Sequence, residues 1–403
     1  MKYFLSVLLV LAVGVGCKEA GNKVSRPSVI SHINMDASCP YFTQTAEGIP
    51  VVSWIEKDSA EDAGTMFYTL YDSAAQMFGP PIEIPVTKGV IPHDENLPKM
   101  LFKKDGVVIA VFGVEANDAR NKYAGKVMYT QSFDGGRSWQ AAQPLVRDTA
   151  GYDQRYFDVA VTKDGEGAIV WLDNRKDTSA EGSSVYFAKA AGKEGFRDEK
   201  RIVSQVCQCC RTRLYVAGTG DIHIVYRAIL NDSIRDMVHQ VSVDQGQTFS
   251  SPVRISADNW VVRGCPHTGP TLTANSSGLH FAWFTMGNGK GAFYCKSVDN
   301  GLSYTKKESL SDEPMAKHPQ IYTIDDRLLL VWDEPVPFRK SSNSRIGYQW
   351  RKADGSLDRA GRLTDSTVYA SYPVLGSFRT DAMVAYKQIV DNKGRIVLNH
   401  IAL

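Results

Sequence analysis

Short runs of mostly apolar residues recur along the chain, and each run ends in an aromatic residue. Their length and their content of Val and Ile are typical of buried β-strands. The seven runs are Val51–Trp54, Ile109–Phe112, Ala168–Trp171, His223–Tyr226, His280–Trp283, Leu329–Trp332 and Met383–Tyr386. The closing aromatics are 49 to 59 residues apart, a period that indicates seven like units of four short strands each.

A polar motif, Ser-x-Asp-x-Gly-x-[Ser/Thr]-aromatic, occurs three times, each time between two strand-like runs. Such a segment reads as a hairpin turn, because the Asp can accept bonds from turn amides and the Gly can take positive φ. The aromatic can then pack back beneath the hairpin. The copies contain Ser132, Asp134, Gly136 and Trp139, then Ser242, Asp244, Gly246 and Phe249, then Ser297, Asp299, Gly301 and Tyr304.

The last unit is one strand short, because only Arg395–Ala402 follows its aromatic run before the chain ends. An alternating segment at the other end of the chain, Pro27–Ile33, can supply the missing outer strand. Full closure of a ring removes an exposed sheet edge, so we expect the two ends of the chain to pair.

The repeated motif resembles the Asp-box of the sialidase/BNR-repeat superfamily of β-propellers. The resemblance implies an all-β propeller of four-stranded blades. The count of aromatic runs favours seven blades, and the six blades of the sialidase catalytic domains are the alternative. We expect a single propeller domain over residues 27–403.

The N-terminus carries one Lys and then an apolar run over 3–15, which is too short to cross a bilayer and indicates a secretory signal. The residues that end at Cys17 resemble a bacterial lipobox. They predict a lipoprotein signal peptide over 1–17, a lipidated Cys17 and a tether over 18–26, with a plain signal peptide as the alternative. Lys18, the residue after this cysteine, resembles the pattern of lipoproteins that are sorted to the outer membrane of the cell envelope.

Charge excludes one class of function. The chain has 46 Lys and Arg against 44 Asp and Glu, a net charge of +2, and no basic block. Nucleic-acid binding is therefore not expected. We expect a monomer that meets the membrane only through its lipid, with a glycan or an envelope protein as its ligand.

In a propeller, the links that enter the inner strands and the turns between second and third strands lie on one face. Polar residues in these segments should therefore converge on one rim. The candidates for a ligand-binding rim are Asp173, Arg175, Arg235, Asp236, His318 and Glu334.

The seven cysteines are unusual. Cys295 falls in a strand and is predicted to be a buried thiol. The links hold Cys39, Cys207, Cys209, Cys210 and Cys265. In an exported protein disulfides are the default, for example from Cys265 to Cys207 or Cys209. The last four, together with His267, could instead bind copper or zinc, and a redox-active pair is the third alternative.

Sialidases hold the substrate carboxylate with three arginines and use a Tyr nucleophile with an Asp acid/base, so the resemblance implies a candidate set here. That set is Arg211, Arg227, Arg263, Tyr372 and Asp153. The family's early arginine motif is absent, since blade one opens at 39–43 without an Arg. We therefore favour a non-catalytic envelope propeller that binds a ligand through a rim rich in Cys and Arg. The alternative is an exo-sialidase-like glycoside hydrolase acting on acidic glycans.

Overall fold

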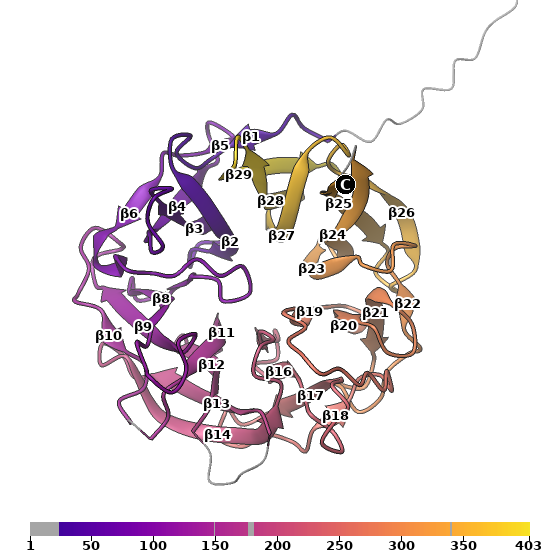
Figure 1. Cartoon of the computed structure of the whole chain (residues 1–403), viewed down its shortest axis with the longest axis horizontal. Coiled ribbons are helices and arrows are strands. Elements are labelled where there is room, and N and C mark those ends of the chain that lie inside the picture. The colour runs from indigo at the N-terminus through magenta and orange to yellow at the C-terminus, as the bar shows by residue number, and fades with distance from the viewer. Residues whose placement is uncertain (1–23, 149, 176–180, 339–340) are drawn as a thin grey trace, which may run out of the picture.

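The computed structural model describes residues 24–148, 150–175, 181–338 and 341–403, which form seven antiparallel sheets around a common centre (Figure 1). In six of the sheets the strands follow chain order from the centre outward, and in the seventh an N-terminal strand takes the outermost place. The predicted seven-bladed propeller is confirmed, and the six-bladed alternative is wrong.

Blades 1 to 3 follow one another along the first half of the chain. Blade 1 has β2 (Asp36–Gln44), β3 (Pro50–Lys57), β4 (Thr65–Asp72), β5 (Met77–Phe78) and β6 (Ile82–Ile84), followed by the 3₁₀ helix η1 (Pro85–Thr87). Blade 2 has β7 (Lys99–Phe102), β8 (Val108–Glu115), β9 (Gly125–Ser132) and β10 (Gln143–Pro144). Blade 3 has β11 (Gln154–Val161), β12 (Gly167–Asp173), β13 (Ser183–Ala190) and β14 (Phe196–Val206). Blade 1 departs from the four-strand expectation because β5 and β6 both pair with β4.

Blades 4 to 7 complete the ring. Blade 4 has β15 (Arg213–Val216), β16 (Ile222–Arg227), β17 (Met237–Ser242) and β18 (Val253–Arg254). Blade 5 has β19 (Thr271–Asn275), β20 (Gly278–Thr285), β21 (Gly291–Ser297) and β22 (Glu308–Ser309). Blade 6 has β23 (Lys317–Ile324), β24 (Arg327–Phe338), β25 (Ser341–Arg351) and β26 (Leu357–Arg362). Blade 7 has β27 (Tyr369–Phe378), β28 (Asp381–Val390), β29 (Lys393–Ile401) and, from the N-terminal side, β1 (Ser28–Val29).

The ring is closed by the pairing of β1 with β29, as the sequence predicted. Ser28 lies opposite Leu398 and Val29 opposite Val397. The amide of Ile30 then donates to the carbonyl of Ile396 at 2.9 Å. Figure 1 shows the indigo strand β1 beside the yellow strand β29 at the outer edge of blade 7.

The core is divided among the blade interfaces. Each pair of neighbouring blades encloses its own cluster of buried apolar side chains. The interface that closes the ring packs Phe42 and Trp54 of blade 1 against Met383 and Leu398 of blade 7. Each interface therefore buries apolar surface that neither of its two blades could bury alone.

The Asp-box motifs form the turns between third and fourth strands. In the first, Asp134 accepts from the Ser138 amide at 2.9 Å and the Ser138 hydroxyl at 2.6 Å, while the Gly136 amide donates to Ser132 Oγ at 2.8 Å. The other two boxes repeat these bonds. These hydrogen bonds hold the pKa of all three aspartates below its usual range. Each box closes its hairpin through its own side chains.

The box glycines and aromatics connect each hairpin to the preceding blade. All three glycines have positive φ, as predicted, and a Cβ on Gly246 would meet the Phe187 ring. The ring of Phe249 lies 5.3 Å from that of Phe187 in blade 3. The hydroxyl of Tyr304 hydrogen-bonds His239 of blade 4 at 2.9 Å.

The predicted leader and tether, with Cys17, lie outside the described residues apart from 24–26. Within the described part of the chain, no helix is long and apolar enough to cross a membrane.

Candidate functional site

A cavity of about 580 Å³ opens on the face formed by the links that enter the inner strands. The links into β7, β15 and β19 line it, together with the start of β11 and the connection from β8 to β9. The Asp-boxes lie at the opposite strand ends, because they connect third to fourth strands. The face predicted from the topology therefore carries a cavity, at blades 2 to 5.

Several residues at or just before the inner strands have a left-handed backbone, which is uncommon for side chains other than Gly. They are Cys39, Tyr156, His267, His318 and Tyr372, with φ between 47° and 61°. Strained residues of this kind cluster at functional sites. Tyr156 and His267 line the cavity.

Tyr156 and two histidines form the inner wall of the cavity. The His93 ring lies 5.5 Å from Tyr156 and 5.7 Å from His267. The Tyr156 amide donates to Asn96 Oδ1 at 2.7 Å, which fixes its unusual backbone. Burial lowers the pKa of His93, and the neighbouring His267 lowers it further. Burial also raises the pKa of Tyr156.

Arg155 brings a guanidinium group to the cavity wall. It pairs with Asp153 at 2.5 Å, and Asp153 in turn accepts the Gly125 amide at 3.0 Å. Asp153, predicted as an acid/base, thus fixes the position of an arginine.

Glu95 and Arg211 form a buried ion pair. Glu95 also accepts the Gly269 amide at 3.0 Å, so it joins the links into three blades. Burial raises the pKa of Glu95, and the positive charge of Arg211 partly opposes that rise. The predicted carboxylate-binding Arg211 therefore already holds a carboxylate of this chain.

His318 and Tyr372 meet in blades 6 and 7. Their rings stack with centroids 4.1 Å apart. Asp333 accepts from His318 Nδ1 at 2.8 Å and from the Tyr372 amide at 2.8 Å. Burial alone would lower the pKa of His318, but the Asp333 carboxylate outweighs burial and the pKa is raised. Burial raises the pKa of the Tyr372 hydroxyl, and the nearby carboxylates of Asp94, Glu95 and Asp333 add to that rise.

The cysteines separate into different environments. The sulfurs of Cys207, Cys209 and Cys210 lie within 4.8 Å of one another and are buried, whereas Cys265 is exposed at the cavity. Cys39 contacts Asp94 Oδ1 at 3.5 Å. All six cysteines of the described residues are free thiols, so the structure does not form the expected bridge from Cys265 to Cys207 or Cys209. Cys295 is buried in β21, as predicted.

Positive charge surrounds the three clustered thiols. Hydrogen bonding with Cys209 and Cys210, aided by the charge of Arg227, lowers the pKa of Cys207. The pKa values of Cys209 and Cys210 are raised instead. Arg235 also lies against Cys207, while its Nη2 reaches Glu181 at 2.5 Å.

The structure places the three arginines of the predicted carboxylate clamp in different environments. Arg211 is paired with Glu95. Arg227 is buried and donates to the carbonyls of Arg235, Thr268 and Phe284 at 2.9 to 3.3 Å. Arg263 is exposed. Arg227 thus joins blades 4 and 5.

Most of the predicted rim residues are occupied in buried ion pairs. Asp173 accepts from Trp171 Nε1 at 3.1 Å and pairs with Arg175 at 2.9 Å. Asp236 holds Arg254 and the amides of Asn259 and Trp260.

Glu334 follows the same pattern, since it accepts from Trp332 Nε1 at 2.8 Å and pairs with Arg345 at 2.8 Å. It was predicted in a turn but lies within β24, which forms a long hairpin with β25. These carboxylates satisfy buried indole and guanidinium donors.

Sequence reasoning missed Tyr156, Asn96 and Asp333. Tyr156 lies in an apolar strand and looks like a core residue. Asp333 directly follows the repeated aromatic Trp332, and this adjacency was the one signal that could have drawn attention to it.

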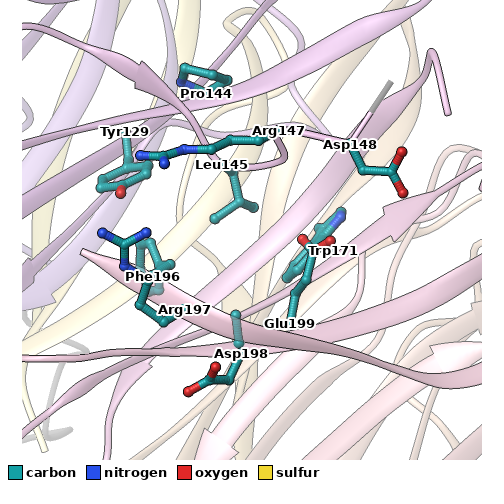
Figure 2. A pocket seen from close by; sticks show the side chains of 11 residues that line it. Tyr129, Pro144, Leu145, Arg147, Asp148, Trp171, Phe196, Arg197, Asp198 and Glu199 are labelled. Atoms are coloured by element: carbon teal, nitrogen blue, oxygen red, sulfur yellow. The ribbon is translucent and has the colours of Figure 1, made fainter. Parts of the chain in front are cut away.

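A smaller hollow of about 180 Å³ lies between the outer strands of blades 2 and 3 (Figure 2). Arg147, Arg197 and Glu199 line it, and Glu199 is already paired with Arg175 at 2.5 Å. The Tyr129 and Phe196 rings meet edge to face, 5.2 Å apart. The smaller hollow lies away from the links where the polar groups converge, so the larger cavity is the better candidate site.

The fold is that of a sialidase-like β-propeller. Three solved structures support the assignment. A protein of unknown function from Dyadobacter fermentans has a TM-score of 0.56 at 15% identity, covering 95% of this chain and 100% of its own. The polysaccharide lyase Uly1 has a TM-score of 0.56 at 13% identity, covering 91% and 90%. The intramolecular trans-sialidase from Ruminococcus gnavus has a TM-score of 0.51 at 8% identity, covering 91% and 94%.

At these identities the likeness concerns the fold alone. No protein-family model matches the chain, and comparison with curated proteins gave no match. The chain therefore has the sialidase-like propeller fold, and its chemistry has to be argued from its own residues.

Proposed function

We propose that this protein is a non-catalytic envelope propeller that binds an acidic residue of a glycan in the cavity at blades 2 to 5. The observation that carries the proposal is the charge of the cavity lining. Arg155 and Lys122 bring positive charge to the lining against one acidic side chain, Glu115, and the imidazoles of His93 and His267 add hydrogen-bonding nitrogens. An anionic ligand fits such a lining better than a cationic one.

The other lining groups suit a sugar. Tyr123 is 71% exposed and presents its ring at the cavity, where a pyranose could stack. Asn96, Asn121 and Gln208 supply amides that can donate to and accept from hydroxyls. Two similar structures are a polysaccharide lyase and a trans-sialidase by name, so the fold serves glycan chemistry elsewhere.

Arg155 is the best candidate for the contact with the ligand carboxylate. Its pairing with Asp153 holds the guanidinium in place at the cavity wall. Guanidinium groups bind carboxylates through paired N–H donors, and a pre-positioned one loses less entropy on binding.

Sialoside hydrolysis, the alternative, has less support. Two of the three arginines that would clamp the substrate are held within the protein, Arg211 by Glu95 and Arg227 by backbone carbonyls. Tyr372 stacks on His318, and burial raises the pKa of its hydroxyl, which disfavours an anionic nucleophile.

The test is a binding titration of the full chain with oligosaccharides that end in a uronic or sialic acid, against their neutral counterparts. We expect binding of the acidic forms alone. Arg155→Ala should weaken it roughly 10- to 100-fold, the effect of losing about 1.5–3 kcal/mol of charge-assisted hydrogen bonding. Arg197→Ala, at the outer hollow, is the matched control. Equal affinity for neutral sugars, or equal loss in the two variants, would contradict the proposal.

The same preparation should leave sialosides intact over a long incubation. If the wild-type chain releases free sialic acid and Tyr372→Phe does not, the proposed binding role is wrong and the hydrolase alternative takes its place.

The lipid anchor belongs to the same proposal, on the strength of the lipobox-like residues before Cys17. Cells fed a labelled fatty acid should incorporate it into the wild-type chain and not into Cys17→Ala. Label that persists in the variant would remove the anchor from the proposal.

A further inference from the structure

The link into blade 4 brings three sulfurs together beneath the cavity. Cys207 Sγ lies 3.5 Å from Cys209 Sγ and 3.8 Å from Cys210 Sγ, and all three lie within 4.8 Å of one another. A metal about 2.3 Å from each of three sulfurs in a plane would set them about 4 Å apart. The thiols are therefore spaced for one shared ion with little rearrangement.

Hydrogen bonds to residues of the neighbouring strands hold the link in this shape. The Cys207 amide donates to the Arg227 carbonyl at 2.8 Å, and the Thr212 hydroxyl donates to the Tyr156 carbonyl at 3.0 Å. Each sulfur belongs to a residue that is at most 3% exposed. A pre-formed and buried set of ligands costs little ordering entropy on binding.

Donors and positive charge surround the sulfurs. Tyr156 Oη and Arg227 Nε are buried and have no hydrogen-bond partner among the described residues. Tyr156 packs in the same buried cluster as the three cysteines, and Arg227 is joined to Cys207 through its carbonyl, which accepts the Cys207 amide. Three thiolates around a monovalent ion carry a net charge of −2, and Arg227 with Arg235 would offset it.

From these observations we infer that Cys207, Cys209 and Cys210 bind one copper(I) ion. Soft thiolates select copper(I), zinc or iron–sulfur clusters. Structural zinc and iron–sulfur centres take four protein ligands, whereas the described residues supply three here. Cys265 and His267 are exposed at the cavity and lie outside the group of three. Three sulfur ligands without a fourth fit copper(I).

Cys209 lines both the cluster and the cavity, which makes the cavity the route by which copper would enter. The inference does not depend on glycan binding, because none of the three cysteines is among the groups proposed to contact the glycan.

The test is an anaerobic titration of the reduced full chain with copper(I) against a competing chelator. We expect one ion per chain and a spectrum of copper–thiolate charge transfer. Cys209→Ser should weaken binding by about 100-fold or more. Loss of a residue that only hydrogen-bonds to a metal ligand already lowers metal affinity about 10- to 100-fold, and Cys209 would be a ligand itself. Cys295→Ser, a buried thiol in another blade, should bind like wild type.

A second measurement needs no variant. Bound copper(I) should protect the three cluster cysteines of the wild-type chain from alkylation, as mapped by mass spectrometry, and leave Cys265 reactive. Three results would overturn the inference: a Cys207–Cys209 disulfide in protein isolated from the cell envelope, stoichiometric zinc that copper(I) does not displace, or equal loss of binding in Cys295→Ser.

Discussion

At the residue scale, the polar side chains near the centre of the ring serve mainly to fix backbone that is unusual. A left-handed residue other than Gly costs of order 1–3 kcal/mol and persists where its surroundings determine it. Tyr372 shows how: its amide donates to Asp333, and its ring stacks on His318. The carboxylate of Asp333 thus holds two left-handed residues at once.

His318 should make stability depend on pH. Its folded pKa is raised through Asp333, so the stabilisation is complete below the unfolded value of about 6.5 and is lost as pH rises through the folded pKa. The free energy of unfolding should therefore fall in that window by at most about 1.4 kcal/mol per pH unit. Denaturant unfolding at a series of pH values measures the slope.

The slope should disappear in His318→Gln and persist in His400→Gln, whose histidine pairs with Asp381 at the edge of blade 7. An unchanged slope in His318→Gln would mean that another group titrates.

Roles set by local sequence were predictable, and roles set by distant contacts were not. Asp134 bonds to residues within four positions, so its turn could be read from the motif. Tyr156 owes its place to Asn96, which lies 60 residues away. Arg211 was predicted to hold a ligand carboxylate, but Glu95, 116 residues distant, holds it instead.

At the scale of elements, the number of blades and the order of their strands followed from the aromatic repeat, but the additional strand of blade 1 and the ends of strands did not. Glu334 was expected in a turn because prolines follow at 335 and 337. The structure instead pairs Pro335 with Ser344 and Pro337 with Ser342 in an extended hairpin. Proline is tolerated where its missing N–H faces no partner strand, a condition that only the tertiary arrangement reveals.

The two-residue strand β1 is predicted to contribute measurably to the stability of the fold. Ile30→Pro removes the amide that bonds to the Ile396 carbonyl and should destabilise the protein by about 1–3 kcal/mol. Thermal and denaturant unfolding measure this loss. Val29→Ala, at a half-exposed position of the same strand, should change stability little, and similar losses in both variants would argue against a specific role of that hydrogen bond.

At the scale of the whole molecule, stability depends on a ring whose last contact joins the two ends of the chain. Val29 and Val397 lie directly opposite each other, and facing positions of paired antiparallel strands are close enough for an engineered disulfide to be tested there. The double variant Val29→Cys/Val397→Cys should, when oxidised, gain up to about 5 kcal/mol, because the bridge closes a loop of nearly the whole chain.

The comparison is between oxidised and reduced forms of that double variant, with wild type under both conditions as the control for the native thiols. A bridge that forms without raising the unfolding temperature would indicate that the ring first opens at an interface other than the one between blades 7 and 1.

The same closure sets an order of events during biosynthesis. Residues 28 and 29 leave the ribosome long before their partners at 397 and 398. Strand β1 must therefore stay unpaired while blades 1 to 6 are synthesised, and the apolar surface of blade 1 that blade 7 will cover stays exposed for the same time. Exposed apolar surface and unpaired strands of this kind favour aggregation of a chain that is still being made.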